Sequence, residues 1–137
     1  MPITNPFLYI WLQMPTHLPY HDVPQDWYEY YLEQADELAK LIISESDEDE
    51  LNNELDTVAR IFAMISNIDD NVGRVMKQLQ DLEIADETLV IYLNDNGPNT
   101  RRYVGPFRGM KTEVYEGGIR SPLWFYWPSR LSAECRW

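Results

Sequence analysis

The chain has 137 residues, 45% of them hydrophobic, so it holds at most one domain with a single core. Its formal net charge is −12, which argues against nucleic acid as a partner, because nucleic-acid-binding chains present a basic surface to the phosphates. No apolar run reaches the roughly 18 residues of a membrane-spanning helix. The single cysteine, Cys135, excludes an internal disulfide.

The charge is unevenly distributed along the sequence. Between Asp22 and Asp56 lie thirteen acidic residues against one basic residue, Lys40, so the acidity belongs to one part of the chain. The stretch 101–120 is basic by contrast and holds Arg101, Arg102, Arg108, Lys111 and Arg120. A local basic cluster in an acidic chain is typical of an anion site. Solvated loop charges are the alternative.

The first predicted element is a buried strand at 7–13, where apolar and aromatic residues follow one another without interruption. A proline-rich loop comes next and contains both histidines of the chain, His17 and His21. Neither histidine stands in a metal-binding spacing such as HExxH. From spacing alone, each is a surface residue or a catalytic one.

Two helices are predicted after this loop. The first spans 26–43, and Asp26 can cap its N-terminus. The second spans 51–83, where apolar residues recur at spacings of three and four and predict a stripe that faces the core. Gly73 in the middle of this helix indicates close packing against a neighbouring element.

The run 88–93 is rich in β-branched residues and shows no polar alternation. A strand that is apolar on both faces is typical of a parallel sheet covered by helices. Because this strand follows a helix after a short loop, we interpret the pair as the second half of a right-handed βαβ crossover. Residues 98–121 are predicted to form a loop, and 123–127 a further strand. The predicted fold class is α/β, with a partial, mostly parallel sheet flanked by helices.

Asp95 and Asn96 follow directly after the strand predicted at 88–93. In open α/β sheets, ligands bind at the carboxyl ends of the strands. A carboxylate beside an amide oxygen offers hard ligands that suit Ca²⁺ or Mg²⁺. The alternative is a simple turn, in which the Asn-Asp-Asn-Gly sequence only reverses the chain.

The segment 109–120 combines paired glycines with Lys111. Glycines allow the backbone to approach a ligand closely or to adopt positive φ. The ammonium group of Lys111 can meet an oxygen of a sulfate or phosphate group. A flexible surface loop is the alternative interpretation of this segment.

Three sequence blocks occur in order, namely PFLYIWLQMPTHLPY, NIDDNVGRVMKQLQDLEIADETLVIYLNDNGP and RGMKTEVYEGGIRSPLWFYWP. Together they resemble the sulfatase family of the alkaline-phosphatase-like superfamily, over nearly the whole chain. The DNG sequence followed by K-x-x-x-Y-E-G-G-x-R-x-P is the most specific part of the resemblance. It implies that residues 1–137 form the C-terminal part of a sulfatase catalytic domain.

The resemblance also implies roles for particular residues. His17 would contact the sulfate ester, Asp95 and Asn96 would ligate an active-site Ca²⁺, and Lys111 would contact the sulfate. These roles suit sulfate-ester cleavage, because a divalent cation and an ammonium group stabilise the negative charge of the sulfuryl oxygens. A histidine can donate a proton or hydrogen bond to the leaving oxygen.

The sequence departs from the family at the nucleophile. Sulfatases use a C-x-P-S-R or S-x-P-S-R motif whose first residue matures to formylglycine, and this sequence lacks that motif. The segment Trp127-Pro128-Ser129-Arg130 ends similarly, but Tyr126 stands where Cys or Ser belongs. The paired N-terminal aspartates of the family are missing as well. We therefore expect a fragment of a sulfatase, inactive alone, whose parent hydrolyses sulfate esters with formylglycine and Ca²⁺.

Two alternatives remain open. One is a phosphodiesterase or phosphonate hydrolase of the same superfamily, and the other is a non-catalytic binding module with a decayed site. The family resemblance implies a periplasmic, secreted or lysosomal protein. The first residues of the chain lack a basic region and a cleavage site, so no signal peptide is predicted there.

Overall fold

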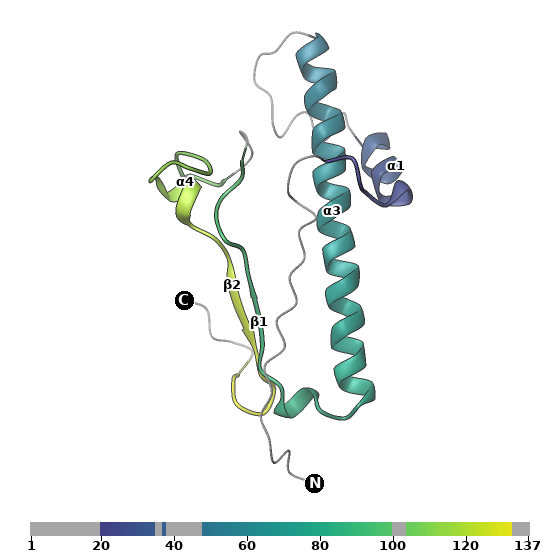
Figure 1. The fold of residues 1–137 in the computed structure, drawn as a ribbon, viewed down its shortest axis with the longest axis vertical. Coiled ribbons are helices and arrows are strands. Elements are labelled where there is room, and N and C mark those ends of the chain that lie inside the picture. The colour runs from purple at the N-terminus through teal and green to yellow at the C-terminus, as the bar shows by residue number, and fades with distance from the viewer. Residues whose placement is uncertain (1–19, 35–36, 38–47, 100–103, 133–137) are drawn as a thin grey trace.

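The computed structural model describes residues 20–34, 37, 48–99 and 104–132. Their helices and strands are, in chain order, α1 (Gln25–Glu33), α3 (Glu48–Asp81), the 3-10 helix η1 (Ala85–Glu87), β1 (Val90–Leu93), α4 (Glu116–Ile119) and β2 (Leu123–Tyr126). Figure 1 shows α1 beside one half of the long α3, and a ribbon of β1 and β2 that η1 joins to the far end of α3. The strand predicted at 7–13 lies outside the described residues.

The helix predicted at 51–83 is confirmed as α3, which begins at Glu48 and ends at Asp81. Acidic residues at its start are favoured by the positive end of the helix dipole. Within the described part of the chain, the buried apolar side chains all belong to this helix, namely Val58, Ala59, Ala63 and Met64. None of the helices described there is long and apolar enough to cross a membrane.

Helix α1 packs along one face of α3. Side-chain hydrogen bonds join the two helices, namely Trp27 Nε1 to Asp70 Oδ2 at 2.8 Å, Tyr28 OH to Asp56 Oδ1 at 2.6 Å, and Tyr31 OH with Ser66 Oγ at 2.8 Å. The ring of Tyr31 also packs on Phe62, with centroids 5.4 Å apart. The helix predicted at 26–43 is confirmed as far as Glu33, where α1 ends, and residues 35, 36 and 38–43 lie outside the described residues.

The C-terminus of α3 is closed by a residue with left-handed backbone. Glu83 has a φ of 58°, the N–H of Glu83 donates to the carbonyl of Gln80 at 2.9 Å, and the N–H of Ile84 donates to Leu79 at 3.1 Å. This pair of bonds is the Schellman arrangement, in which glycine is the usual residue at the left-handed position. Glu83 therefore carries backbone strain that glycine would avoid.

The surroundings of Gly73 differ from the close packing predicted there. A Cβ placed on this glycine would meet none of the described residues within 4 Å, and the residue is exposed. The predicted close packing at this position is wrong, because none of the elements described in the structure covers this part of α3.

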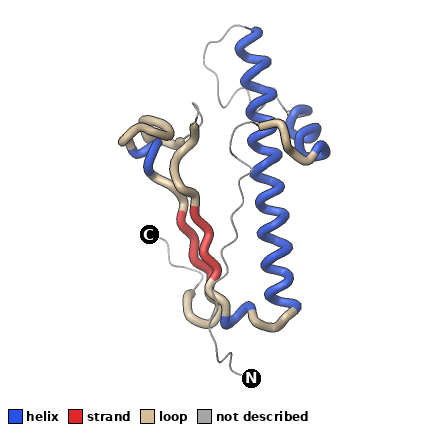
Figure 2. Tube along the Cα trace, viewed as in Figure 1, coloured by secondary structure: helices blue, strands red, loops and turns tan. Residues whose placement is uncertain are grey.

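The two strands form a two-stranded antiparallel sheet, in which Val90 pairs with Tyr126 and Leu93 pairs with Leu123 (Figure 2). This one pair is antiparallel, whereas the mostly parallel sheet that the sequence predicts stays a prediction, because the strand predicted at 7–13 lies outside the described residues. The antiparallel direction follows from the chain after β1, which folds back on the end of that strand. There the N–H of Asn94 donates to the carbonyl of Pro122 at 3.4 Å, which continues the antiparallel pairing.

The strands are apolar on both faces, as predicted, but they are not buried in the described chain. The exposed fraction is 60% for Leu93, 67% for Trp124 and 54% for Phe125. Contacts between described elements join α1 with α3, β1 with β2, and α3 with η1, so the ribbon does not pack on α3. For the same reason the predicted core stripe of α3 is partly uncovered, and Ile65 is 47% exposed.

Candidate active site

The loop after β1 presents two oxygen-bearing side chains. Asp95 accepts a 2.9 Å hydrogen bond from the N–H of Asn96 through Oδ1, and its side chain is exposed. Asn96 donates from Nδ2 to the carbonyl of Gly97 at 2.8 Å. This bond turns the amide nitrogen toward the loop and leaves the amide oxygen of Asn96 available. The second carboxylate oxygen of Asp95 accepts no hydrogen bond from the described residues.

Lys111 lies in a tight turn of residues 110–113. The N–H of Glu113 donates to the carbonyl of Met110 at 3.0 Å, and the N–H of Lys111 donates out of the turn to the carbonyl of Pro98 at 2.8 Å. Since Pro98 closes the loop that holds Asp95 and Asn96, this bond ties the backbone of the lysine to that loop.

Glycines interlock the two loops. A Cβ on Gly97 would collide with the carbonyl of Gly117, and one on Gly118 would collide with the carbonyl of Met110. Hydrogen bonds run across the same contact, from the N–H of Gly97 to Gly118 at 2.8 Å and from the N–H of Gly117 to Arg108 at 2.8 Å. Gly117 and Gly118 are buried. The predicted close approach at these glycines is thus made by the chain's own backbone.

The described basic residues of 101–120 are of two kinds, namely arginines that contact aromatic rings and Lys111, which does not. The guanidinium of Arg108 lies 4.1 Å from the ring centroid of Tyr115, and that of Arg120 lies 4.7 Å from Phe107. Arg120 is also 3.3 Å from Glu116 in an exposed ion pair. Among the described basic residues of the cluster, Lys111 has neither an ion pair nor a ring contact, so its charge is the one available to an anion.

The predicted site residues are therefore partly brought together. Asp95, Asn96 and Lys111 lie on two interlocked loops, 95–98 and 108–118, at the end of the β1–β2 ribbon, and we call these two loops the loop body. His17 lies outside the described residues. No group of three or more His, Cys, Asp or Glu side chains that could hold a metal occurs in the described ranges. Asp95 and Asn96 fit Ca²⁺ as hard oxygen ligands, but they supply two of the roughly six to eight that calcium takes.

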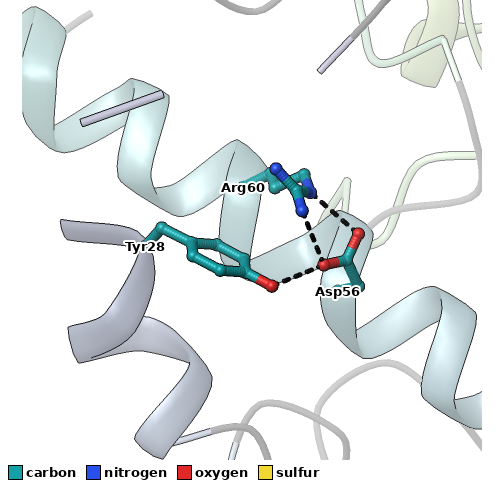
Figure 3. Close-up of polar contacts among 3 residues, drawn as sticks. All are labelled: Tyr28, Asp56 and Arg60. Carbon is teal, nitrogen blue, oxygen red and sulfur yellow. Dashed lines mark hydrogen bonds and ion pairs between the residues drawn. The ribbon is translucent and has the colours of Figure 1, made fainter. Parts of the chain in front are cut away.

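A second polar cluster lies at the contact of α1 and α3 (Figure 3). Asp56 accepts two hydrogen bonds from Arg60, at 2.8 and 3.1 Å, and one from Tyr28. The bonds from Arg60 lower the pKa of Asp56, and the bond to Asp56 raises the pKa of Tyr28. Because these groups satisfy one another, the cluster is a clamp between helices. The spacing of four residues between Asp56 and Arg60 indicates an ion pair on one helix from the sequence alone, whereas the contact with Tyr28 was not predictable.

Residues that sequence reasoning missed stand beside Lys111. Glu113 accepts a hydrogen bond from the N–H of Met110 at 3.0 Å, and Thr112 has a φ of 77°. The signal for Glu113 is its position three residues after Met110, the spacing at which a glutamate closes a capping box. The sequence holds no signal for Thr112, since β-branched residues rarely adopt positive φ.

The sulfatase family model matches residues 2–135, which is nearly the whole chain. Human N-acetylgalactosamine-6-sulfatase is 37% identical over 75 residues, a match that covers 50% of this chain and 14% of that protein. Human arylsulfatase A is 38% identical over 73 residues, with coverage of 50% and 14%. The chain thus matches only a small part of the length of these curated relatives.

A crystal structure of a candidate sulfatase from Bacteroides fragilis is also similar. The TM-score is 0.61 at 25% identity, and the match covers 85% of this chain and 25% of that one. This likeness supports the α/β class and the alkaline-phosphatase-like fold that the sequence predicted. Together with the family match over residues 2–135, it shows that the chain belongs to the sulfatase family.

Proposed function

We propose that this chain supplies part of the active site of a sulfate-ester hydrolase. In this proposal Lys111 binds the sulfate group beside a Ca²⁺ that Asp95 and Asn96 hold in part. The observation that carries it is the 2.8 Å bond from the N–H of Lys111 to the carbonyl of Pro98. That bond joins the backbone of the candidate anion ligand to the loop with the candidate metal ligands.

The chemistry of each group supports its role. When bound, Ca²⁺ supplies positive charge that draws electron density from the sulfuryl oxygens. The free carboxylate oxygen of Asp95 and the amide oxygen of Asn96 face no competing hydrogen-bond donor among the described residues. The ammonium group of Lys111 meets a sulfuryl oxygen, where such a donor lowers the barrier by about 3–4 kcal/mol. By family resemblance, His17 donates to the leaving oxygen.

The nucleophile belongs to another segment of the protein. The family's formylglycine arises in a C-x-P-S-R or S-x-P-S-R motif, which this sequence does not contain. The similar segment at 127–130 has a different task, since Trp127 Nε1 and Ser129 Oγ both donate to the carbonyl of Asp86, at 3.1 and 2.5 Å. This anchor lies at the end of the β1–β2 ribbon opposite to Asp95. The isolated chain is therefore inactive, and hydrolysis belongs to a longer protein.

Two measurements on the 137-residue chain test this proposal. With a chromogenic aryl sulfate and Ca²⁺, we expect no turnover, and robust turnover would contradict the inactivity of the chain. In a titration with inorganic sulfate followed by nuclear magnetic resonance, we expect the Lys111 amide to shift in the wild type and not in Lys111→Ala.

A matched control for the titration is Lys77→Ala, which removes an exposed lysine that pairs with Asp81 on the same helix. This control should respond to sulfate as the wild type does. Equal responses of wild type and Lys111→Ala would contradict the anion-binding role. A parallel titration with inorganic phosphate separates the classes, because a marked preference for phosphate would favour the phosphodiesterase or phosphonate hydrolase alternative.

A further inference from the structure

The turn that carries Lys111 is closed from both sides by one residue. The N–H of Glu113 donates to the carbonyl of Met110 at 3.0 Å, and the N–H of Met110 donates to Oε2 of Glu113, also at 3.0 Å. The bond that Glu113 accepts has the spacing of the glutamate bond in a capping box, and the bond that it donates closes the turn on the backbone carbonyl of Met110, so the pair brackets Lys111. Glu113 and Lys111 form no ion pair in the described structure, so Glu113 acts on the lysine only through the backbone.

The backbone around Lys111 is held in an unusual conformation. Gly109 has a φ of 94° and Thr112 a φ of 77°, so positive φ angles stand on both sides of the lysine. A β-branched residue at positive φ is strained, and such strain persists only where the surroundings impose it. A Cβ at Gly109 would come within 2.7 Å of the Cβ of Tyr115 and 3.0 Å of Oε2 of Glu113. The carboxylate of Glu113 therefore lies close to the backbone of Gly109, at a position where Tyr115 and the positive φ already favour glycine.

We propose that Glu113 is a positioning residue for Lys111, whose carboxylate holds the 110–113 turn and so fixes the direction in which the lysine side chain leaves the backbone. This inference rests on the proposed function, because it takes Lys111 as the anion ligand. Glu113 touches neither anion nor metal in this arrangement. Its effect is to keep the ammonium group directed toward the anion instead of distributed over many rotamers.

The test compares Glu113→Ala with Glu113→Gln in the 137-residue chain. Alanine removes the acceptor, whereas glutamine removes the charge but keeps an oxygen for the N–H of Met110. Amide hydrogen exchange of Met110 reports the turn itself, and a sulfate titration followed at Lys111 reports the anion site. Glu87→Ala is a control for net charge, since it removes the same charge from η1.

For Glu113→Ala we expect faster exchange of the Met110 amide and about threefold weaker sulfate binding, the loss of one exposed hydrogen bond. Glu113→Gln and Glu87→Ala should stay near the wild type in both measurements. Equal losses in Glu113→Ala and Glu113→Gln would show a charge effect and overturn the positioning role. The positioning role would also be overturned if the Met110 amide exchanged at the same rate in Glu113→Ala as in the wild type, while the wild type binds sulfate. A wild type without any sulfate response contradicts the proposed function instead, and the exchange comparison then still decides whether Glu113 holds the turn.

Discussion

Tyr28 on α1 donates a 2.6 Å hydrogen bond to Asp56 on α3, across 28 positions of sequence. Arg60 completes the contact, because it binds the same carboxylate and places its guanidinium 4.5 Å from the centroid of the Tyr28 ring. The carboxylate thus holds a neighbour on its own helix and a partner on another one. This clamp fixes α1 beside the buried segment of α3, and it can be tested separately from the loop body.

Tyr28→Phe removes the hydroxyl and keeps the ring. We expect the free energy of unfolding of the helical pair to fall by about 1 kcal/mol, the net contribution of a typical hydrogen bond. Urea unfolding followed by circular dichroism measures this change. Tyr30→Phe is the control, since its hydroxyl makes no hydrogen bond within the described residues. A loss of equal size in both variants would assign the effect to general packing and not to the clamp.

The clamp also predicts a pH dependence. The hydrogen bonds from Arg60 lower the pKa of Asp56 below its ordinary value of 3.8. A carboxyl group with a lowered folded-state pKa contributes stability that is present above the ordinary value and is lost as the pH falls through the folded pKa. The difference in unfolding free energy between wild type and Asp56→Asn should therefore be constant near neutral pH and shrink below about pH 4. A difference that grew on acidification would contradict the clamp.

Two glycine substitutions should act in opposite directions. In Gly117→Ala the new methyl group collides with backbone carbonyls of Arg108 and Gly109, so we expect a loss of about 1–3 kcal/mol in the stability of the loop body. Amide exchange at Met110 and Lys111 reports this loss.

In Gly73→Ala the methyl group meets none of the described residues on an exposed helix, and the free energy of unfolding of the α1–α3 pair should rise by about 1 kcal/mol in urea unfolding. A gain in both variants would contradict the interlock of the loops.

Glu83→Gly tests the end of α3. Glycine adopts the φ of 58° at this position without the strain that glutamate carries, although it loses more entropy on folding. We expect a net gain of roughly 0.5–1 kcal/mol in the unfolding free energy of α3. Glu87→Gly is a suitable comparison, since Glu87 has ordinary backbone angles and should lose stability. If Glu83→Gly destabilised the helix, the Schellman closure would be contradicted.

The long helix was the most predictable part of the fold, because an apolar spacing of three and four repeats along most of its 34 residues. The strand direction was not predictable from the apolar run at 88–93. That run shows that the strand is suited to burial on both faces, but the direction of its partner depends on how residues 94–122 fold back. The exposure of Trp124 and Leu93 was equally hidden, since a sequence shows what a side chain favours and not which surface covers it.

The sequence predicted which residues belong to the candidate site, but not the backbone geometry that holds them. Asp95, Asn96 and Lys111 were identified from residue type and position, the resemblance assigned their roles, and the structure ties the backbone of Lys111 to the loop of the other two. The contribution of Glu113 depends on the positive φ of Gly109 and Thr112, which no periodicity or composition reveals. The role of the paired glycines was predicted as closeness to a ligand, whereas the described contacts are with other backbone.

The loops around Lys111 are joined to the rest of the described chain by the β1–β2 ribbon, whose own stability is low. An isolated pair of strands is marginally stable at best in water, and the described elements offer it no third strand and no covering helix. Under the proposed function, an anion would bind only the fraction of molecules in which the ribbon, and with it the loop body around Lys111, is formed. The apparent dissociation constant for an anion then equals the intrinsic one divided by that fraction. Under the proposed role of Lys111, strand pairing and anion binding are thermodynamically linked, so added sulfate would stabilise the paired strands.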